Sequence, residues 1–281
     1  MTDLKNMRSL EHGSAMGESP ASARQETNFA PLPPDAMIIV PVRNFVLFPG
    51  MVMPVSIGRP KSMAAAQQAV REQRQVGILK QRDPSVADPN AIEMHRMGTV
   101  ANVVRYITGP DGTNHLVCQG EQRFQVLEFL GGWPFLVARV LRIPESLSRT
   151  PEIEARFLHL RGQALEALEL MPQAPQELCA AIQTIDTPGA LADLAVAYMD
   201  VKPEEKQEIL ETIDVAARIE KVSRLMAQRI EVLRLAAEIG KQTKAALDER
   251  QREVLLREQM AAIQKPAWRR RGGQGRRDGR A

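Results

Sequence analysis

Cysteine and histidine, which most often hold metal ions or take part in catalysis, are scarce in this sequence. The two cysteines, Cys118 and Cys179, fall in different regions without metal-ligand spacing, so we expect two reduced, partly buried thiols. No His-Glu-x-x-His motif or paired-cysteine motif occurs. We expect ordinary imidazoles at all four scattered histidines: His12, His95, His115 and His159. The sequence therefore predicts no catalytic residue, no cofactor and no metal site.

Long uncharged apolar runs are also missing. A transmembrane helix needs a run of about 18 residues or more, and a signal peptide needs an N-terminal apolar run of about 7 to 15 residues. The 281 residues include 44% hydrophobic and 25% charged residues, which is ordinary for a soluble protein of one or two domains. We therefore expect a cytoplasmic protein that makes no membrane contact.

The first 36 residues have little periodic apolar pattern. They are rich in serine, proline, glycine and glutamate, a composition that offers too little apolar surface to offset the entropy lost on ordering. We predict a disordered leader over residues 1–36. Met7 and Met16 are alternative starts, so the sequence leaves the true start codon open.

Residues 41–62 combine many apolar side chains with four prolines and two glycines. Each proline removes an N–H donor and restricts the residue before it, so no continuous helix forms here. We predict two short buried strands, Met37–Val42 and Met53–Ile57, joined by an apolar loop and followed by a helix over Lys61–Gln75.

Further strand-length runs follow as far as Pro144, and the Gly109-Pro110-Asp111-Gly112 sequence between two of them is a hairpin signal. Several short strands at this spacing favour a small barrel or curled sheet. The predicted strands are Val76–Leu79, Gly98–Ile107, Thr113–Gly120, Arg123–Leu130 and Phe135–Ile143.

After Pro151 the apolar period changes to that of helices. Asp214 is the expected N-cap of a final long helix, which contains no proline between Val215 and Lys265. Its first half carries an apolar face, whereas its second half is too polar for a good coiled-coil seam. The second half is therefore exposed, either as a solvated charged helix or awaiting another chain or domain. The shorter predicted helices are Glu152–Met171, Pro175–Ile185, Pro188–Met199 and Lys202–Thr212.

Three motifs near the N-terminus carry a family resemblance: Pro41-Val42-Arg43, Phe48-Pro49-Gly50 and Gly58-Arg59-Pro60-Lys61-Ser62. In this order they resemble the opening of the N-terminal region of the ATP-dependent Lon protease family. The resemblance returns at Gly120-Glu121-Gln122-Arg123-Phe124 and in the helix Gln251–Lys265, where Val254 replaces the family's usual aromatic residue.

This resemblance implies an α+β fold in which a β-rich, PUA-like pseudo-barrel precedes an α-helical bundle with one long C-terminal helix. It implies a substrate-binding domain over residues 37–144, a helical bundle over 150–212 and a long helix over 214–265. The family's N-terminal region is implicated in capturing unfolded or damaged proteins and in supporting the hexamer. We thus expect unfolded or damaged proteins as partners, with self-association or contact with intact Lon protease through the long helix.

The family's catalytic parts are not expected in this chain. A Lon protease needs a Gly-x-x-x-x-Gly-Lys-Ser/Thr phosphate loop and, in a later domain, a serine and lysine catalytic pair. Gly58-Arg59-Pro60-Lys61-Ser62 lacks the second glycine, and Pro60 has no N–H to offer a phosphate. The sequence therefore predicts a non-enzymatic binding module that ends before the ATPase domain.

An apolar surface on the loop between the first two strands is the candidate substrate-binding site. Unfolded chains expose apolar side chains, and flexible methionine suits a surface that accepts many partners. The alternative is that these side chains fill the domain's own core. The candidate residues are Phe45, Leu47, Phe48, Met51 and Met53.

The C-terminal tail, residues 266–281, departs from the family pattern. Six arginines and one aspartate give it a net charge of +5. We interpret it as the product of a truncated or frameshifted Lon gene. The alternative is an independent adaptor or regulatory protein whose disordered Arg/Gly-rich tail binds nucleic acid.

Overall fold

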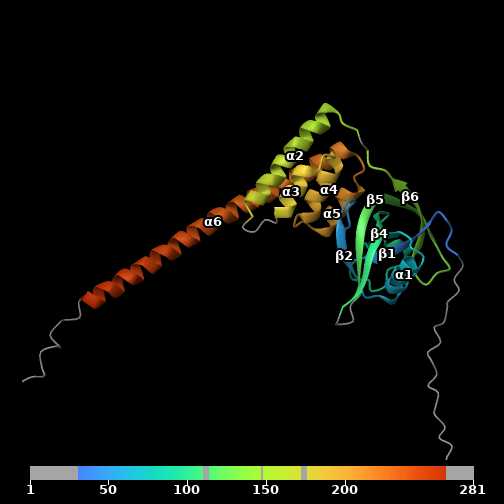
Figure 1. The fold of residues 1–281 in the computed structure, drawn as a ribbon, viewed down its shortest axis with the longest axis horizontal. Coiled ribbons are helices and arrows are strands. Elements are labelled where there is room, and N and C mark those ends of the chain that lie inside the picture. Colours follow the sequence, from blue (N-terminus) through green and yellow to red (C-terminus); the bar gives the residue numbers. More distant parts are fainter. Residues whose placement is uncertain (1–30, 110–113, 147, 172–175, 264–281) are drawn as a thin grey trace, which may run out of the picture. The chain divides into compact units, whose positions relative to one another are not determined.

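A ring of five β-strands forms the N-terminal part of the computed structural model, which describes residues 31–109, 114–146, 148–171 and 176–263. The strand order is β2-β5-β4-β3-β1-β6, and a further pairing of β5 with β6 closes the ring and leaves β2 on its edge (Figure 1). The strands are β1 (Ala36–Val42), β2 (Val52–Ile57), β3 (Val76–Lys80), β4 (Met97–Thr108), β5 (Asn114–Leu130) and β6 (Val137–Ile143). The closure of the sheet into a ring confirms the predicted barrel-like α+β fold.

One long strand replaces two predicted ones. We expected Thr113–Gly120 and Arg123–Leu130 to be separate, but β5 runs through both. A bulge at Glu121 lets the strand bend without a turn, because Val100 pairs with Gln122 while Ala101 pairs with Gly120. The bend also divides the partners of β5, which pairs with β2 before it and with β6 after it.

The helix after β2 is shorter than predicted. Helix α1 (Pro60–Arg71) stops before Gln75 because Gln73 adopts a positive φ of 53°, a left-handed conformation that ends a helix. The Arg74 N–H then donates to the carbonyl oxygen of Ala69 at 2.9 Å. A single 3₁₀ turn, η1 (Ala91–Glu93), lies in the loop before β4.

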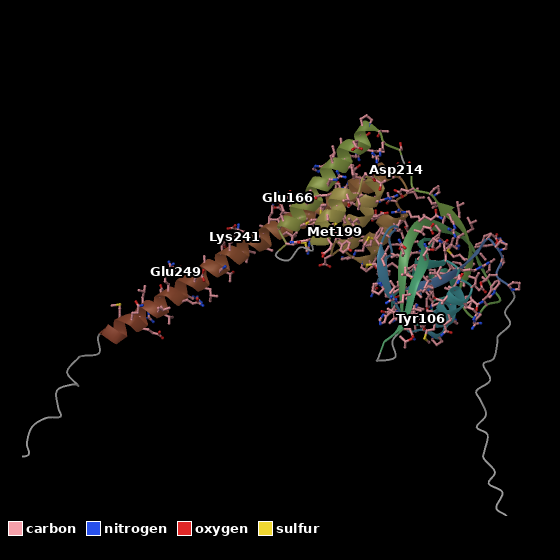
Figure 2. The ribbon with its side chains drawn as sticks, in the orientation of Figure 1. Tyr106, Glu166, Met199, Asp214, Lys241 and Glu249 are labelled. Carbon is pink, nitrogen blue, oxygen red and sulfur yellow. The ribbon has the colours of Figure 1, made fainter. Side chains whose placement is uncertain are left out.

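Within the described residues after β6, five helices form the C-terminal part (Figure 1). Asp214 caps the last helix as predicted, since its Oδ1 accepts the Ala217 N–H at 2.8 Å (labelled in Figure 2). Thr150 similarly caps the first of them through the Ile153 N–H. The helices are α2 (Pro151–Glu169), α3 (Gln176–Thr184), α4 (Pro188–Tyr198), α5 (Pro203–Glu211) and α6 (Val215–Ile263).

A buried charge network joins the ring to the helices. Arg123 of β5 forms a two-bonded ion pair with Asp193 of α4, at 2.9 and 2.7 Å, and both side chains are almost fully buried. Arg218 of α6 lies 3.5 Å from the same carboxylate and donates to Glu145 at 2.8 Å. The Arg123 Nε also donates to the carbonyl oxygen of Leu210 at the end of α5. Residues from β5, α4, α5, α6 and the segment after β6 therefore meet here.

Neutralising Asp193 tests this junction. Asp193→Asn leaves two buried guanidinium groups without their shared carboxylate, so we expect the free energy of unfolding to fall by about 3 to 5 kcal/mol. Urea denaturation followed by circular dichroism measures the change. Asp186→Asn is the matched control, because the Asp186 side chain is 85% exposed and its loss is expected to change stability by less than about 0.5 kcal/mol. Equal effects of the two substitutions would contradict the role of the network.

Helix α6 changes character along its length. Its first turns bury an apolar face that includes Ile219, Val222, Met226 and Ile230. From Glu238 to Met260 every side chain is exposed, as predicted for the second half; Lys241 and Glu249 of this stretch are labelled in Figure 2. None of the helices in the described part of the chain combines the length and apolarity needed to cross a membrane.

Truncation separates the two halves of α6. A chain ending at Gly240 retains the buried face, so its midpoint in urea is expected to match that of the full chain within error. At concentrations where the full chain is monomeric, its hydrogen exchange should in turn be slow over residues 215–234 and fast over residues 241–260. A large loss of stability on truncation would show that the distal half belongs to the folded core.

Candidate functional site

The loop between β1 and β2 packs tightly onto the ring. Proline at 49 and glycine at 50 form its turn: Gly50 has a φ of +77°, and the Met51 N–H donates to the Phe48 carbonyl at 3.3 Å. Gly120 of β5 exchanges two backbone hydrogen bonds with this turn, at 2.9 and 2.8 Å. A Cβ at position 120 would collide with the Phe48 carbonyl oxygen, so only glycine permits this approach.

The five predicted site residues divide into two groups. Leu47, Phe48 and Met51 are buried, with 2%, 0% and 7% of their surface exposed, and they belong to the hydrophobic core. Phe45 and Met53 are half-buried and line a small cavity of about 80 Å³. The substrate-binding role of these residues stays a prediction. Phe48 and Met51 also line the small cavity, but Phe45 and Met53 are the two of the five that are half-buried and not buried.

Substitution distinguishes the two groups. Phe48→Ser removes a fully buried ring, and we expect it to lower the free energy of unfolding by about 3 to 5 kcal/mol. Phe45→Ser removes a half-buried ring at a cavity edge and should lower it by clearly less. Thermal and urea unfolding of the two variants side by side check this order. Equal destabilisation would show that Phe45 belongs to the core as firmly as Phe48.

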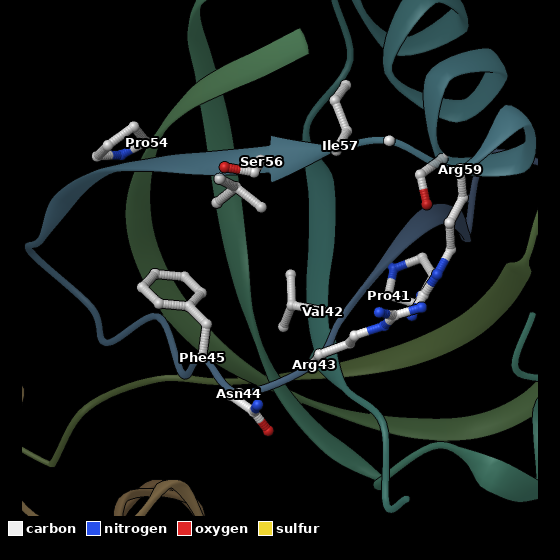
Figure 3. Close-up of a pocket in the computed structure, with 12 residues that line it drawn as sticks. Pro41, Val42, Arg43, Asn44, Phe45, Pro54, Ser56, Ile57 and Arg59 are labelled. Atoms are coloured by element: carbon white, nitrogen blue, oxygen red, sulfur yellow. The ribbon is translucent and has the colours of Figure 1, made fainter. Parts of the chain in front are cut away.

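A larger cavity of about 550 Å³ opens beside the same loop (Figure 3). The end of β1, the first residues of the loop, strand β2 and the first turn of α1 enclose it. Six of its twelve lining residues are apolar: Pro41, Val42, Phe45, Pro54, Val55 and Ile57. One wall is therefore suited to an apolar side chain.

The other wall is polar and positively charged. Arg43 and Arg59 extend toward one another across it (Figure 3), and none of the lining residues is acidic. The Arg59 guanidinium donates to the Gln81 Oε1 at 2.5 Å. Burial, and then the positive charge of Arg43, lower the pKa of Arg59, while nearby Asp88 opposes this shift. Two like charges thus face one cavity.

Ser62 completes this wall. It lies in the first turn of α1 and is 2% exposed, and its Oγ has no hydrogen-bond partner in the structure. The first turn of α1 contains no acidic residue, and the Arg59 side chain makes no N-cap hydrogen bond. Unpaired backbone N–H groups and the helix dipole make such a helix start positive.

The sequence reasoning missed Arg43, Arg59 and Ser62 as site residues. They lie in the two outer motifs near the N-terminus, of which only Gly58-Arg59-Pro60-Lys61-Ser62 was weighed as a ligand site, namely a phosphate loop. Arg43 and Ser62 stand 19 positions apart in the sequence (62 − 43), and only the return of strand β2 to the end of β1 brings them to one cavity. The two motifs could have drawn attention to these residues. The sequence did not show that the motifs meet at one cavity.

Metal and thiol chemistry find no support in the described residues. No group of three or more His, Cys, Asp or Glu side chains within them could hold a metal ion. Cys118 and Cys179 are free, and burial raises the pKa of Cys118 to about 12. The Cys118 thiol is therefore protonated at neutral pH, which disfavours it as a nucleophile.

Residues 36–228 match the family model of the ATP-dependent protease La (LON) substrate-binding domain. The chain belongs to this family. This confirms the resemblance seen in the N-terminal motifs and gives the barrel and the following helices a shared identity as a Lon substrate-binding domain.

Relatives of known sequence agree with this membership. Over 231 residues the chain is 63% identical to a Lon protease from Methylocella silvestris, covering 82% of this chain and 28% of that protein. It is 58% identical over 235 residues to a Lon protease from Phenylobacterium zucineum, covering 83% of this chain and 30% of that protein. The chain thus spans less than a third of the length of these relatives.

A solved structure shows the same fold. The N-terminal domain of a Mycobacterium avium complex Lon protease superposes with a TM-score of 0.57 at 23% identity, covering 70% of this chain and 98% of that domain. At this identity the likeness concerns the fold alone. It places the ring and helices of this Lon substrate-binding domain in a known architecture.

Proposed function

We propose that this chain is a non-catalytic polypeptide-binding module that captures unfolded or damaged proteins. The observation that carries the proposal is the half-buried apolar pair Phe45 and Met53, held beside open cavities in a Lon substrate-binding domain. Unfolded chains differ from folded ones chiefly in the apolar side chains that they expose, so a receptor for them needs apolar surface of its own.

The geometry supports a binding role over a purely structural one for this pair. The turn at Phe48–Met51 fixes the loop, so Phe45 and Met53 stand on a rigid support. Methionine has a flexible, polarizable side chain that adapts to different partners. A fixed backbone with adaptable side chains suits weak binding to many clients.

The distal half of α6 supports a second part of the proposal, which is assembly. Five large apolar side chains on it are more than half exposed: Leu247, Val254, Leu255, Leu256 and Met260. We propose that this stretch packs against another copy of the chain or against intact Lon protease. A partner would remove these side chains from water.

The remaining parts of the proposal concern catalysis, origin and location. The family match is to the substrate-binding domain, so we propose binding without ATP hydrolysis or peptide cleavage. The proposed location is the cytoplasm. The origin as a truncated or frameshifted Lon gene stays a prediction, which the genomic DNA downstream would test. The alternative of an adaptor with a nucleic-acid-binding tail concerns residues outside the described part of the chain.

Paired substitution tests client binding. Phe45→Ser with Met53→Ser should weaken binding to a permanently denatured, fluorescently labelled protein by about thirtyfold, because each lost apolar contact contributes roughly 1 kcal/mol. Fluorescence anisotropy measures the dissociation constant, and circular dichroism verifies folding. The control is Leu141→Ser, which removes a 52% exposed apolar side chain on β6 and should leave binding unchanged. Unchanged binding by the folded double variant would refute this site.

A further inference from the structure

We infer that the 550 Å³ cavity holds a carboxylate of the bound polypeptide, between Arg43, Arg59 and Ser62. The inference rests on the proposed function and adds a substrate class to it. Clients would be recognised by a negative group next to an apolar side chain, and not by apolar contacts alone.

The charges of the cavity provide the first argument. Two arginines face it without an acidic lining residue. Burial, and then the positive charge of Arg43, lower the pKa of Arg59, so the two like charges repel one another. An anion between the two guanidinium groups would relieve that repulsion. Arginine presents a planar array of donors that matches a carboxylate, so the pair is chemically suited to this ligand.

The unpaired hydroxyl provides a second, independent argument. A buried hydroxyl without a partner is unfavourable, and such groups in folded proteins call for an explanation. Ser62 lines the cavity, and its buried Oγ has no partner and can donate one hydrogen bond. Its position in the first turn of α1 adds the positive end of a twelve-residue helix. Both features favour a negative ligand at the same wall.

The apolar wall decides which anion fits. Half of the lining residues are apolar, including Val42, Phe45 and Pro54. A free phosphate would also meet the two arginines, but it would lose hydration against the apolar wall without gaining partners there. A carboxylate attached to an apolar residue matches both walls at once, as at the C-terminus of a chain or at an acidic residue beside an apolar one.

Short fluorescent peptides test the inference with the full chain. One apolar sequence is prepared as the free acid, as the C-terminal amide, and as the amide with one internal glutamate. We expect the free acid or the glutamate peptide to bind about tenfold tighter than the neutral amide, because a charge-assisted hydrogen bond contributes roughly 1.5 to 3 kcal/mol. A preference for the free acid identifies an α-carboxylate, and a preference for the glutamate peptide identifies a side-chain carboxylate.

Three variants test whether the preference for a carboxylate arises in this cavity. Arg43→Gln should reduce the preference for the acid to within about twofold, whereas Arg105→Gln, which alters an exposed arginine on β4 outside this cavity, should preserve it. Ser62→Ala should weaken binding of the acid by about three- to tenfold without lowering the melting temperature, because the hydroxyl that it removes has no protein partner. A residue with only a structural role would not show this combination.

The possible outcomes separate the inference from the proposed function. Equal affinities of all three peptides would overturn the inference and leave apolar client binding intact. A preference for the acid that survives both Arg43→Gln and Ser62→Ala would also overturn it, as would displacement by inorganic phosphate without any preference among the peptides. If no peptide binds, the inference fails together with the proposed function.

Discussion

The buried ion pair between Arg123 and Asp193 is the interaction on which the arrangement of the two parts depends. Removing two charges from water is expensive, and such a pair is favourable only when the remaining donors and acceptors are satisfied. Here they are, because the Arg123 Nε donates to the Leu210 carbonyl and Arg218 approaches the shared carboxylate. Removing one residue of the network would leave the charges of its partners buried and unpaired.

The same network completes the end of helix α5. The last carbonyl groups of a helix lack intrahelical partners and carry partial negative charge. Arg218 donates to the carbonyl oxygens of Thr212 and Ile213 at 2.9 and 3.0 Å, and Arg123 donates to that of Leu210 at 2.9 Å. The two arginines therefore donate to the carbonyl groups at the end of α5 and neutralise the Asp193 carboxylate of α4. Through Arg123 of β5 they also connect these helices to the ring.

The ring in turn determines which residues of the β1–β2 loop are buried and which remain at the surface. Its turn is bound to Gly120 at the bend of β5, so its buried residues stabilise the fold while its two ends remain at the surface. One end carries Phe45 beside the positively charged cavity, and the other carries Met53 at the start of β2. Apolar capture and charge recognition thus lie within one short segment, which is why the proposed function and the carboxylate inference concern neighbouring residues.

The sequence by itself determined the class of fold, most elements and the family, because these depend on local signals. Proline and glycine punctuation, apolar periodicity and the N-cap at Asp214 act over a few residues. The sequence did not show that β5 is one strand, since a bulge at Glu121 looks locally like a turn.

Tertiary structure alone decided which loop residues are core and which residues share a cavity. Phe45 and Phe48 have the same side chain three positions apart, and only the packing of the hydrophobic core buries the second. Arg43 and Ser62 meet at one cavity because strand β2 returns the chain to the end of β1. Burial and proximity are sums over contacts distant in sequence, which local patterns do not encode.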